Sequence, residues 1–593
     1  MTHTILKPAA LLMLLTLGVE ASTLRLSSRR YTDESNGFSF SSPDKWDQIP
    51  TRFNEVLLVG KWAGKAKKGW YAPEGYVLKF VKRASETENA ASGAPGGPVG
   101  IPGYRGLLEG QAKDLWEYID RSYMVKFDVA EEDADFKVTD KTVRAHFKVL
   151  REKLDAGGAS KSQLRELAQR QVVIVAAQFE RRDESDTGYG LFYFCTAADE
   201  EDMRSAFELS IKRFRILDPE VEEAGEDGEP PLTDADIFVD SETKPEAWRE
   251  IRKKKLIAGW TALDTKNYLL IYNQEVKRAL IKAIALQIEA IRSQVYEVVF
   301  PPTREVKAIS VVRVCKDAAE YHKYGGPGGS AGYWSSGDEE LVFYQDKSNK
   351  SDSLRVLYHE AFHQYIFYAV GNVAPHSWFN EGHGDYFAGH NYKARKFEAD
   401  VFRWRTGIIA NALAQKSYVP LRAFLKYTQG EYYSNPGLCY AQGWSFVYFL
   451  REVERRKIKK YQKYWGLLDK YFEAIKANVK EVQEKGLFGL EDPPQPPPGP
   501  PPAEGEEAAP PVEPEKPKSK LPAIPGLDAP FPGEHPEAGA PPTPGTPGAD
   551  GETRTVAGGE FRDARGALDV AVDQAFRGID LDQLEKDWIE FSK

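Results

Sequence analysis

Residues 354–389 constrain the fold more strongly than any other part of the chain. At the start of this stretch the apolar side chains recur at steps of three and four: Leu354, Leu357, Tyr358, Ala361, Phe362, Tyr365, Ile366 and Ala369. Such spacing is the stripe of a helix packed on a core, and Gly371 is placed to end that helix. Residues 377–388 predict a second helix that enters the same core through Trp378, Phe379, Tyr386 and Phe387.

The first of these helices carries His359, Glu360 and His363 in the pattern His-Glu-x-x-His. Residues four apart lie one turn apart on the same helical face, so the two imidazoles can bind one metal ion. Glu360 projects about 100° round the helix from His359, too far to be a close third ligand. It is near enough to reach a water molecule held by the ion. The pattern therefore predicts a metal site with Glu360 as the general base.

A tetrahedral catalytic zinc site needs a third protein ligand and leaves the fourth position for water. Glu381, 18 residues after His363 and on the second predicted helix, is the expected third ligand. Asp385 lies one turn further along that helix. We expect its carboxylate to accept the free ring N–H of a liganding histidine and so to fix the tautomer. Asn380 is placed with Asp385 in the set of residues that support the ligands.

The His-Glu-x-x-His pattern followed at this distance by Asn380-Glu381-Gly382 resembles the gluzincin metallopeptidases. These are the thermolysin-like and aminopeptidase-like enzymes, whose third ligand is a glutamate on the next helix. The spacing from Glu381 to Asp385 looks like the thermolysin pattern, although the gap after His363 is slightly shorter. The run WFNEGHGDYFAG is similar to small peptidase MA-like domains of bacterial exported proteins.

The resemblance covers about residues 354–390. It implies Zn²⁺ as the cofactor and a peptide or protein as the substrate. It also implies a small β-sheet before the metal-binding helix and a helical C-terminal half. The alternative is a core helix with two solvated histidines. Five of the nine histidines lie within 32 residues, which argues against that alternative: His359, His363, His376, His383 and His390. The last three are equally compatible with ordinary loop or surface positions.

Peptide hydrolysis builds negative charge on the former carbonyl oxygen, and a phenol can stabilise that charge. Residues 396–414, 421–428 and 440–453 are expected to be helical and to form the C-terminal half. Related peptidases use a tyrosine or histidine from this half. Among Tyr432, Tyr433 and Tyr440, we expect Tyr440 to be the donor, with an ordinary core or surface phenol as the alternative.

Residues 268–272, 309–314 and 340–345 predict strands, and residues 275–295 predict a helix. The strand at 340–345 comes directly before the metal-binding helix, where gluzincins present an edge strand to the substrate. We therefore expect it to pair with an extended peptide through main-chain hydrogen bonds. A plain edge strand with no ligand is the alternative.

Residues 31–218 predict a first α/β domain. Short runs rich in aromatic and β-branched residues indicate strands at 37–40, 56–60, 76–81, 172–179 and 190–195. Residues 107–125 and 200–214 have helical periodicity. The opening GFSFSSPDKWDQIP and the closing FRILDP are similar to small α/β domains of the PsbP and Mog1 type. An acidic linker at 219–240 separates this domain from the peptidase domain at 241–490, so the expected class is α+β.

Residues 1–21 predict a secretory signal peptide, with Lys7, an apolar run from Ala9 to Leu17, and Val19 and Ala21 before the cleavage site. The run is too short to span a bilayer, and no lipid-anchor cysteine accompanies it. We expect a secreted or periplasmic protein with no membrane span. Cys195, Cys315 and Cys439 are expected to be buried free thiols. The net charge of −10, without a long basic run, makes nucleic acid an unexpected partner.

Residues 493–555 predict a disordered insertion, because 21 of the 38 prolines lie between Pro493 and Pro547. A spacer is the simplest interpretation, and a protein partner that binds proline-rich segments is the alternative. Residues 561–593 predict helices that dock back on the helical half, with Asp580 and Gln583 as a capping box and one buried stripe: Leu581, Leu584, Trp588 and Phe591.

These expectations together describe an exported zinc metallopeptidase with His359, His363 and Glu381 as ligands and Glu360 as the base. Two alternatives stay open. One is a non-catalytic zinc-containing module that binds or scaffolds partners in the cell envelope. An intact Glu360 argues against it, since a binding protein does not need a base. The other is a metal-dependent hydrolase that acts on a non-peptide amide.

Overall fold

The structure is a computed structural model of the chain. It describes residues 24–52, 55, 57–65, 72–81, 112–123, 125–154, 160–183, 187–217, 241–328, 330–347, 350–485 and 564–593. The expected signal peptide (1–21), acidic linker (219–240) and proline-rich insertion (493–555) lie outside the described residues. The described residues fall into two compact units. One lies within Met1–Gln48, Leu57–Arg83 and Ala112–Glu223, and the other within Ile49–Val56, Ala84–Gln111 and Ala224–Lys593.

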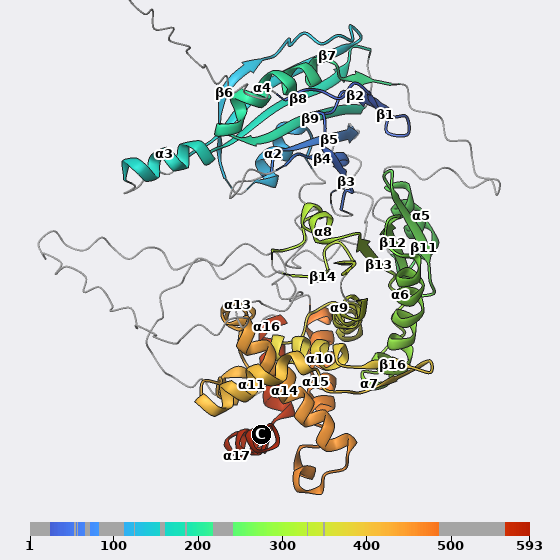
Figure 1. The fold of residues 1–593 in the computed structure, drawn as a ribbon, viewed down its shortest axis with the longest axis vertical. Helices are drawn as coiled ribbons and strands as arrows, with labels where there is room; N and C mark the ends of the chain where they lie inside the picture. The colour runs from blue at the N-terminus through green and yellow to red at the C-terminus, as the bar shows by residue number, and fades with distance from the viewer. Residues whose placement is uncertain are drawn as a thin grey trace, which may run out of the picture. The chain divides into compact units, whose positions relative to one another are not determined.

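The first unit is built on a seven-stranded sheet (Figure 1). Its order is β3 (Asp47–Ile49), β4 (Leu58–Ala63), β5 (Glu74–Val81), β9 (Thr187–Thr196), β8 (Val172–Arg181), β7 (Val143–Glu152) and β6 (Phe127–Asp133). The ladders from β4 to β6 are all antiparallel. The sheet is therefore not the parallel one that an α/β domain implies. A second sheet joins β1 (Tyr31–Asp33), β2 (Phe38–Phe40) and β10 (Arg215–Ile216).

Helix α4 (Ala197–Lys212) packs on β8 and β9 and buries aromatic rings between helix and sheet. The rings of Tyr193 and Phe207 stack at 4.3 Å, and those of Phe179 and Phe214 at 4.2 Å. Two further helices are α2 (Leu115–Ser122) and α3 (Lys161–Arg170). The first unit thus has its own apolar core.

The second unit contains a five-stranded sheet in the order β11 (Trp260–Asp264), β12 (Tyr268–Asn273), β13 (Ser310–Cys315), β15 (Glu340–Tyr344) and β14 (Gly332–Ser335). The three inner strands are parallel, and β11 and β14 are antiparallel edges. The expectation that residues 340–345 form an edge strand is wrong, because β15 pairs on both sides. The chain turns at residues 336–339, where Glu339 has a φ of 51°, and this turn places β14 at the edge beside β15.

Two long helices cover this sheet and share one core with it, α6 (Arg278–Ile291) and α9 (Lys350–Val370). Helix α6 continues into a π-helical turn at Arg292–Tyr296 and the short α7 (Glu297–Val299). The Tyr296 hydroxyl donates to the Tyr358 carbonyl oxygen at 2.6 Å and so ties this turn to α9. Two shorter helices complete this half, α5 (Pro245–Lys254) and α8 (Ala318–Tyr324).

The remaining half is helical: α10 (Ser377–Ala388), α11 (Arg403–Gln415), α12 (Leu421–Phe424), α13 (Gln429–Ser434), α14 (Pro436–Arg455), a 3-10 turn (Lys459–Tyr464) and α15 (Leu467–Glu484). The expected helix at 396–414 begins only at Arg403. A hairpin of β16 (Asn391–Lys393) and β17 (Lys396–Glu398) precedes it, because Ala394 and Arg395 adopt positive φ and reverse the chain.

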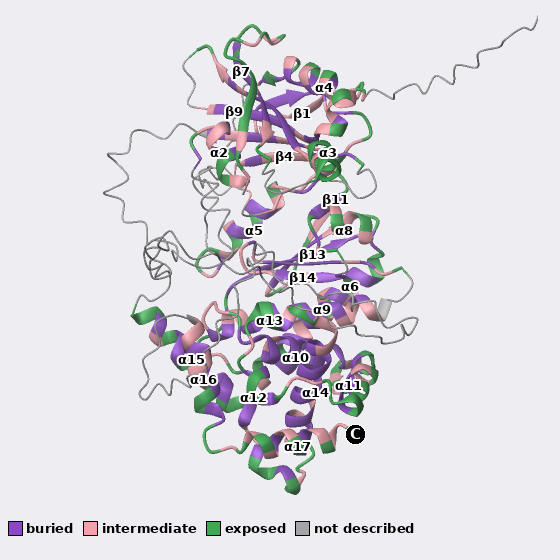
Figure 2. Ribbon diagram, turned by 90° about the vertical axis from the view of Figure 1, so that its left-hand side faces the viewer, coloured by how far each residue is buried: buried purple, intermediate pink, exposed green. Residues whose placement is uncertain are grey.

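Helix α10 is buried along almost its whole length (Figure 2). It crosses α14 closely, since a Cβ on Gly382 would lie 2.6 Å from the Gly443 carbonyl oxygen. A Cβ on Gly443 would in turn lie 2.8 Å from the Tyr432 hydroxyl. The glycine of the Asn-Glu-Gly motif is therefore needed for helix packing.

The C-terminal helices α16 (Ala564–Ala575) and α17 (Leu581–Phe591) pack on the helical half. The buried indole of Trp588 donates to Ser445 Oγ at 3.0 Å. His376, which precedes α10, contacts Asp569 of α16 through Nε2 at 2.9 Å. The chain segment that follows the expected insertion thus stabilises the start of α10.

His376, His383 and His390 are all buried, so the interpretation of these histidines as surface residues is wrong, although His376 and His390 do lie in the irregular backbone on either side of α10. The ring Nδ1 atoms of His383 and His390 donate to main-chain oxygens four residues earlier, at 2.8 and 3.0 Å. Helical pitch brings the His383 ring onto the core side of α10, which the local sequence alone does not reveal. The three cysteines are buried and unpaired, as expected.

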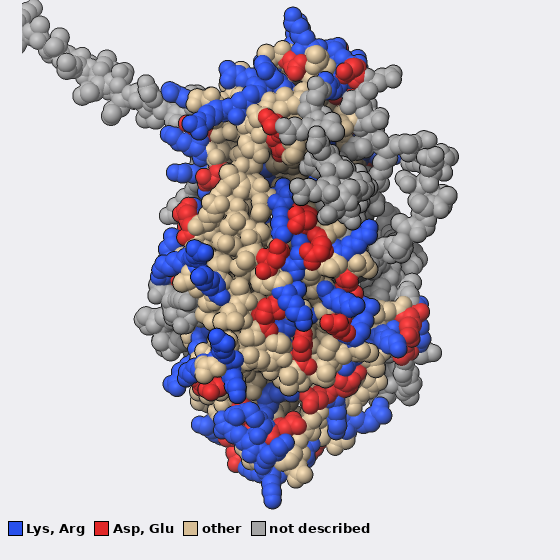
Figure 3. Space-filling view, turned by 90° about the vertical axis from the view of Figure 1, so that its right-hand side faces the viewer, with Lys and Arg blue, Asp and Glu red and all other residues tan. Residues whose placement is uncertain are grey.

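Within the described residues, every helix is too short or too polar to cross a bilayer. On the face drawn in Figure 3, basic and acidic side chains are interspersed among the atoms shown in colour. The chain as a whole has 79 Lys and Arg against 89 Asp and Glu.

The buried histidines predict a loss of stability in acid. Burial lowers the pKa of His390 to about 4, whereas the unfolded ring titrates near 6.5. The unfolded state therefore binds the extra proton first, and stability falls as the pH drops from about 6.5 towards 4. Between pH 7 and pH 5, His390 should account for about 2 kcal/mol of lost unfolding free energy. In urea denaturation at both pH values, His390→Gln should lose correspondingly less than wild type. Equal losses would contradict this assignment.

Candidate metal centre

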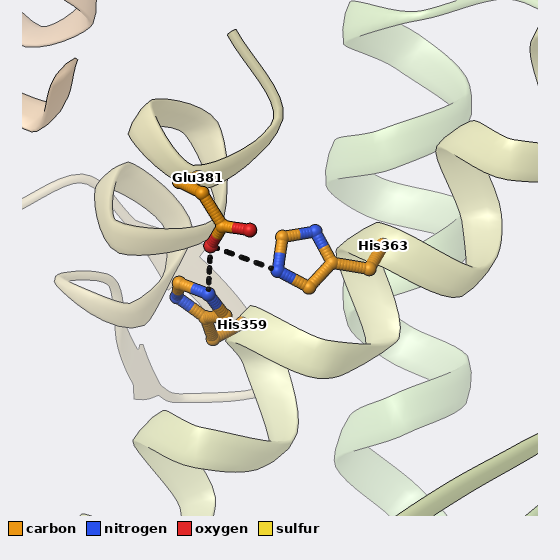
Figure 4. A group of neighbouring side chains, drawn as sticks. All are labelled: His359, His363 and Glu381. Atoms are coloured by element: carbon orange, nitrogen blue, oxygen red, sulfur yellow. Dashed lines mark hydrogen bonds and ion pairs between the residues drawn. The ribbon is translucent and has the colours of Figure 1, made fainter. Parts of the chain in front are cut away.

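The candidate centre lies where α9 and α10 pack together (Figure 4). His359 and His363 project from α9, and Glu381 projects from α10 towards both rings. His359 Nε2 lies 3.0 Å from Glu381 Oε2, and His363 Nε2 lies 3.3 Å from the same oxygen. Their candidate ligand atoms all lie within 4.8 Å of one another. The structure therefore brings the three expected ligands together.

The separations fit a tetrahedral zinc ion. With Zn–N and Zn–O bonds of about 2.0–2.1 Å, neighbouring ligand atoms should lie about 3.3 Å apart. The two measured nitrogen–oxygen separations fall close to that value. Both imidazoles also turn the same atom, Nε2, towards a common point, and a neutral imidazole nitrogen is a good zinc ligand.

The other nitrogen of each ring faces an oxygen atom that supports the ligand. His363 Nδ1 lies 2.9 Å from the side-chain oxygen of Asn380, which can only accept, so this nitrogen is the donor. His359 Nδ1 lies 3.1 Å from Asp385 Oδ1, within ion-pair distance but outside good hydrogen-bond geometry. Asn380 and Asp385 thus stand where residues that fix the histidine tautomers are expected.

The two oxygens of Glu381 have separate neighbours. Oε2 faces the two imidazoles, whereas Oε1 accepts a hydrogen bond from the Tyr433 hydroxyl at 2.7 Å. Tyr433 lies on α13 and is only half-buried. Because the phenol binds Oε1, Oε2 stays available to bind a cation. The same hydrogen bond fixes the orientation of the carboxylate plane.

Glu360 is only 2% exposed, and the charges of His359, His363 and Glu381 affect the pKa of its carboxyl group. Burial raises the pKa of its carboxyl group to about 6, although His359 and His363 act in the opposite direction. Burial also disfavours a charged His359, but the carboxylates of Asp385 and Glu381 more than offset this and raise its pKa well above 6.5. The histidines likewise hold the pKa of Glu381 well below its usual range, against the effect of burial.

Arg405 is a site residue that the sequence analysis missed. It lies on α11, is 2% exposed, and its Nε donates to Asp385 Oδ2 at 2.7 Å. A signal for it exists in the sequence, because Arg405 shares the buried face of α11 with Ile409, Ala412 and Leu413. A charged residue on the buried face of a helix needs a partner.

Tyr440 approaches the centre through its ring. The ring is buried and lies 6.3 Å from the His359 ring, with 24° between the two planes. The Tyr433 hydroxyl, seven residues earlier, donates to Glu381 Oε1. The short α13, which places Tyr433, lies within a segment that the sequence analysis left unassigned.

A scan against protein-family models and a search of curated proteins gave no match. Among solved structures, the chain is similar to the solution structure of cyanobacterial PsbP (CyanoP) from Synechocystis, at 12% identity and a TM-score of 0.21. The likeness covers 34% of this chain and 96% of that chain. The likeness concerns the N-terminal region.

Gly384 should be indispensable for the position of His359. A Cβ at residue 384 would lie 2.8–2.9 Å from three atoms of the His359 ring. Gly384→Ala should therefore displace the ring and weaken zinc binding about 10-fold or more, as measured by competition with a chelating dye.

Gly407→Ala is the matched control, because a Cβ there meets nothing within 4 Å and the residue lies inside α11. This control should keep zinc affinity and raise stability by about 0.5–1 kcal/mol through helix propensity. Unchanged zinc affinity in Gly384→Ala would show that the ring is not held as described.

Proposed function

We propose that this chain is an exported zinc-dependent peptidase of the gluzincin type. One observation supports the proposal: the Nε2 atoms of His359 and His363 and one oxygen of Glu381 converge where α9 and α10 cross. The remaining nitrogen of each ring faces a side-chain oxygen of Asn380 or Asp385. A structural role alone does not call for three such groups around one point. Export is part of the proposal because of the signal-like residues 1–21.

Zinc, when bound by His359, His363 and Glu381, supplies a Lewis acid that polarises a carbonyl group and makes water more acidic. Glu360 follows His359 on α9 and is buried beside the ligands. We assign it as the base that takes a proton from the attacking water and gives that proton to the leaving amine. Burial suits this role, because bulk water cannot exchange freely with the proton.

Tyr433 is the proposed donor to the oxyanion that forms on the substrate carbonyl. Its hydroxyl already lies beside the ligand carboxylate, 2.7 Å from Glu381 Oε1. A donor in this place needs only a small movement to reach an oxygen bound next to Glu381. We therefore assign this role to Tyr433, on the strength of its bond to Glu381.

An extended peptide is the proposed substrate, and β14 is the strand that would pair with it. Within the described residues, β14 pairs with β15 alone, so its outer side presents unpaired main-chain groups. It also runs against α9, since a Cβ on Gly332 would lie 2.5 Å from Val356 Cγ1. Main-chain pairing binds peptides with little dependence on their sequence.

Glu360→Gln should keep zinc and lose hydrolysis, because the amide fills the same space but takes no proton. Cleavage of a peptide library should fall by about 10²–10⁴-fold, with one zinc ion per chain retained. Hydrolysis at the wild-type rate would contradict the mechanism. Zinc at full occupancy in wild type without any cleavage would instead favour a non-catalytic binding module.

Tyr433→Phe, assayed with zinc at saturation, should lower kcat by about 100-fold and change KM little, since the proposed bond to the oxyanion forms mainly in the transition state. Tyr440→Phe keeps the ring that contacts His359 and should stay within about threefold of wild type. Steady-state kinetics on one peptide substrate measures both. If kcat fell more in Tyr440→Phe than in Tyr433→Phe, Tyr440 would be the donor to the oxyanion.

A further inference from the structure

Arg405 is linked to the metal ligand His359 through one buried carboxylate. Its Nε donates to Asp385 Oδ2 at 2.7 Å, and Asp385 Oδ1 lies 3.1 Å from His359 Nδ1. Arg405, Asp385 and His359 are 2%, 0% and 2% exposed. Water therefore does little to screen or replace these contacts.

A second connection runs from Arg405 to the same imidazole through Tyr440. The Arg405 guanidinium lies over the Tyr440 ring, 5.0 Å from its centroid. The Tyr440 ring is in turn near-parallel to the His359 ring at 6.3 Å. Four helices thus each contribute one residue to a closed cycle of contacts. The residues are His359 of α9, Asp385 of α10, Arg405 of α11 and Tyr440 of α14.

Arg405 does not only neutralise the charge of Asp385; it also orients the Asp385 carboxylate. A buried ion pair gains little net stability, because two charges must leave water. What an arginine adds is orientation, since its planar group fixes the plane of a carboxylate. With Oδ2 held by Arg405, Oδ1 is the oxygen that faces His359. The rotation of the imidazole, and hence the direction of Nε2, depends on that oxygen.

We propose that Arg405 is a positioning residue for the metal centre. It holds Asp385 so that His359 presents Nε2 to the ion. The inference rests on the proposed metal site and does not depend on peptide hydrolysis. Arg405 is not one of the three proposed ligands, and its effect passes through Asp385.

Arg451, on α14, offers a matched comparison, because it is an arginine that contacts a histidine of α10. It too is largely shielded from solvent, and its Nε donates to His383 Nε2 at 3.2 Å, while Nη1 pairs with Asp469 at 3.0 Å. His383 is not one of the proposed ligands. Replacing Arg451 removes an arginine–histidine contact of α10 without touching the connection to His359.

Zinc affinity, measured by chelator competition on the full chain, tests the proposal apart from activity. Arg405→Met should weaken zinc binding about 10-fold or more, and Asp385→Asn about 10–100-fold. The double variant should bind about as weakly as Asp385→Asn alone, because the proposed effect of Arg405 on His359 passes through Asp385 and not through the Tyr440 ring. Arg405→Lys, which keeps the charge but loses the planar group, should lose less than Arg405→Met. Arg451→Met should stay within about twofold of wild type, whatever its effect on the melting temperature.

Wild-type affinity in Arg405→Met would overturn the proposal, and so would losses that multiply in the double variant. If Arg405→Met does not fold, Arg405→Lys combined with Asp385→Asn gives the same test of non-additivity. A chain that binds zinc in this pattern but cleaves no peptide would refute the proposed function and leave the role of Arg405 intact.

Discussion

The buried crossing of α9 and α10 is the constraint on which the rest of the second unit depends. It takes His359, Glu360, His363 and Glu381 out of water, each with at most 9% of its surface exposed. Burying ionisable groups is costly unless they are paired or bind a metal. The surrounding residues reduce that cost by pairing with particular atoms of these side chains. Asn380 and Asp385 face the outer ring nitrogens, and Tyr433 takes one oxygen of Glu381, so the remaining ligand atoms face one another.

Tight helix packing keeps those atoms in place. Gly382 and Gly443 let α10 and α14 approach to main-chain distance, and Gly384 leaves room for the His359 ring. The C-terminal helices also stabilise this packing. Trp588 donates a hydrogen bond to Ser445 of α14, and Asp569 contacts His376 at the start of α10. A segment that follows a long proline-rich stretch therefore contributes to the rigidity of α10. Rigid support of this kind is what a site requires when its geometry must hold to a fraction of an ångström.

Local patterns in the sequence were sufficient to predict the helix of the His-Glu-x-x-His motif, the second helix at 377–388 and the three inner strands of the sheet. The signals there are strong, since the apolar spacing and the chemical motif point the same way. Strand β6 was missed because its sequence, FDVAEED, is acidic and almost wholly exposed. The two hairpins at β14–β15 and β16–β17 depend on positive φ at Glu339, Ala394 and Arg395, residues that carry no glycine signal. The partners of Arg405 and Tyr433 follow only from tertiary packing, because each side chain reaches its partner from another helix.

X-ray absorption at the zinc edge, on the full chain loaded with one equivalent of metal, addresses the central claim most directly. We expect a four-coordinate ion with two imidazole nitrogens at about 2.0–2.1 Å and a carboxylate oxygen at about 2.0–2.2 Å. The imidazole signature should vanish when both His359 and His363 are replaced. An ion without imidazole in its coordination sphere, or a chain that takes up no stoichiometric zinc, would contradict the metal centre described here.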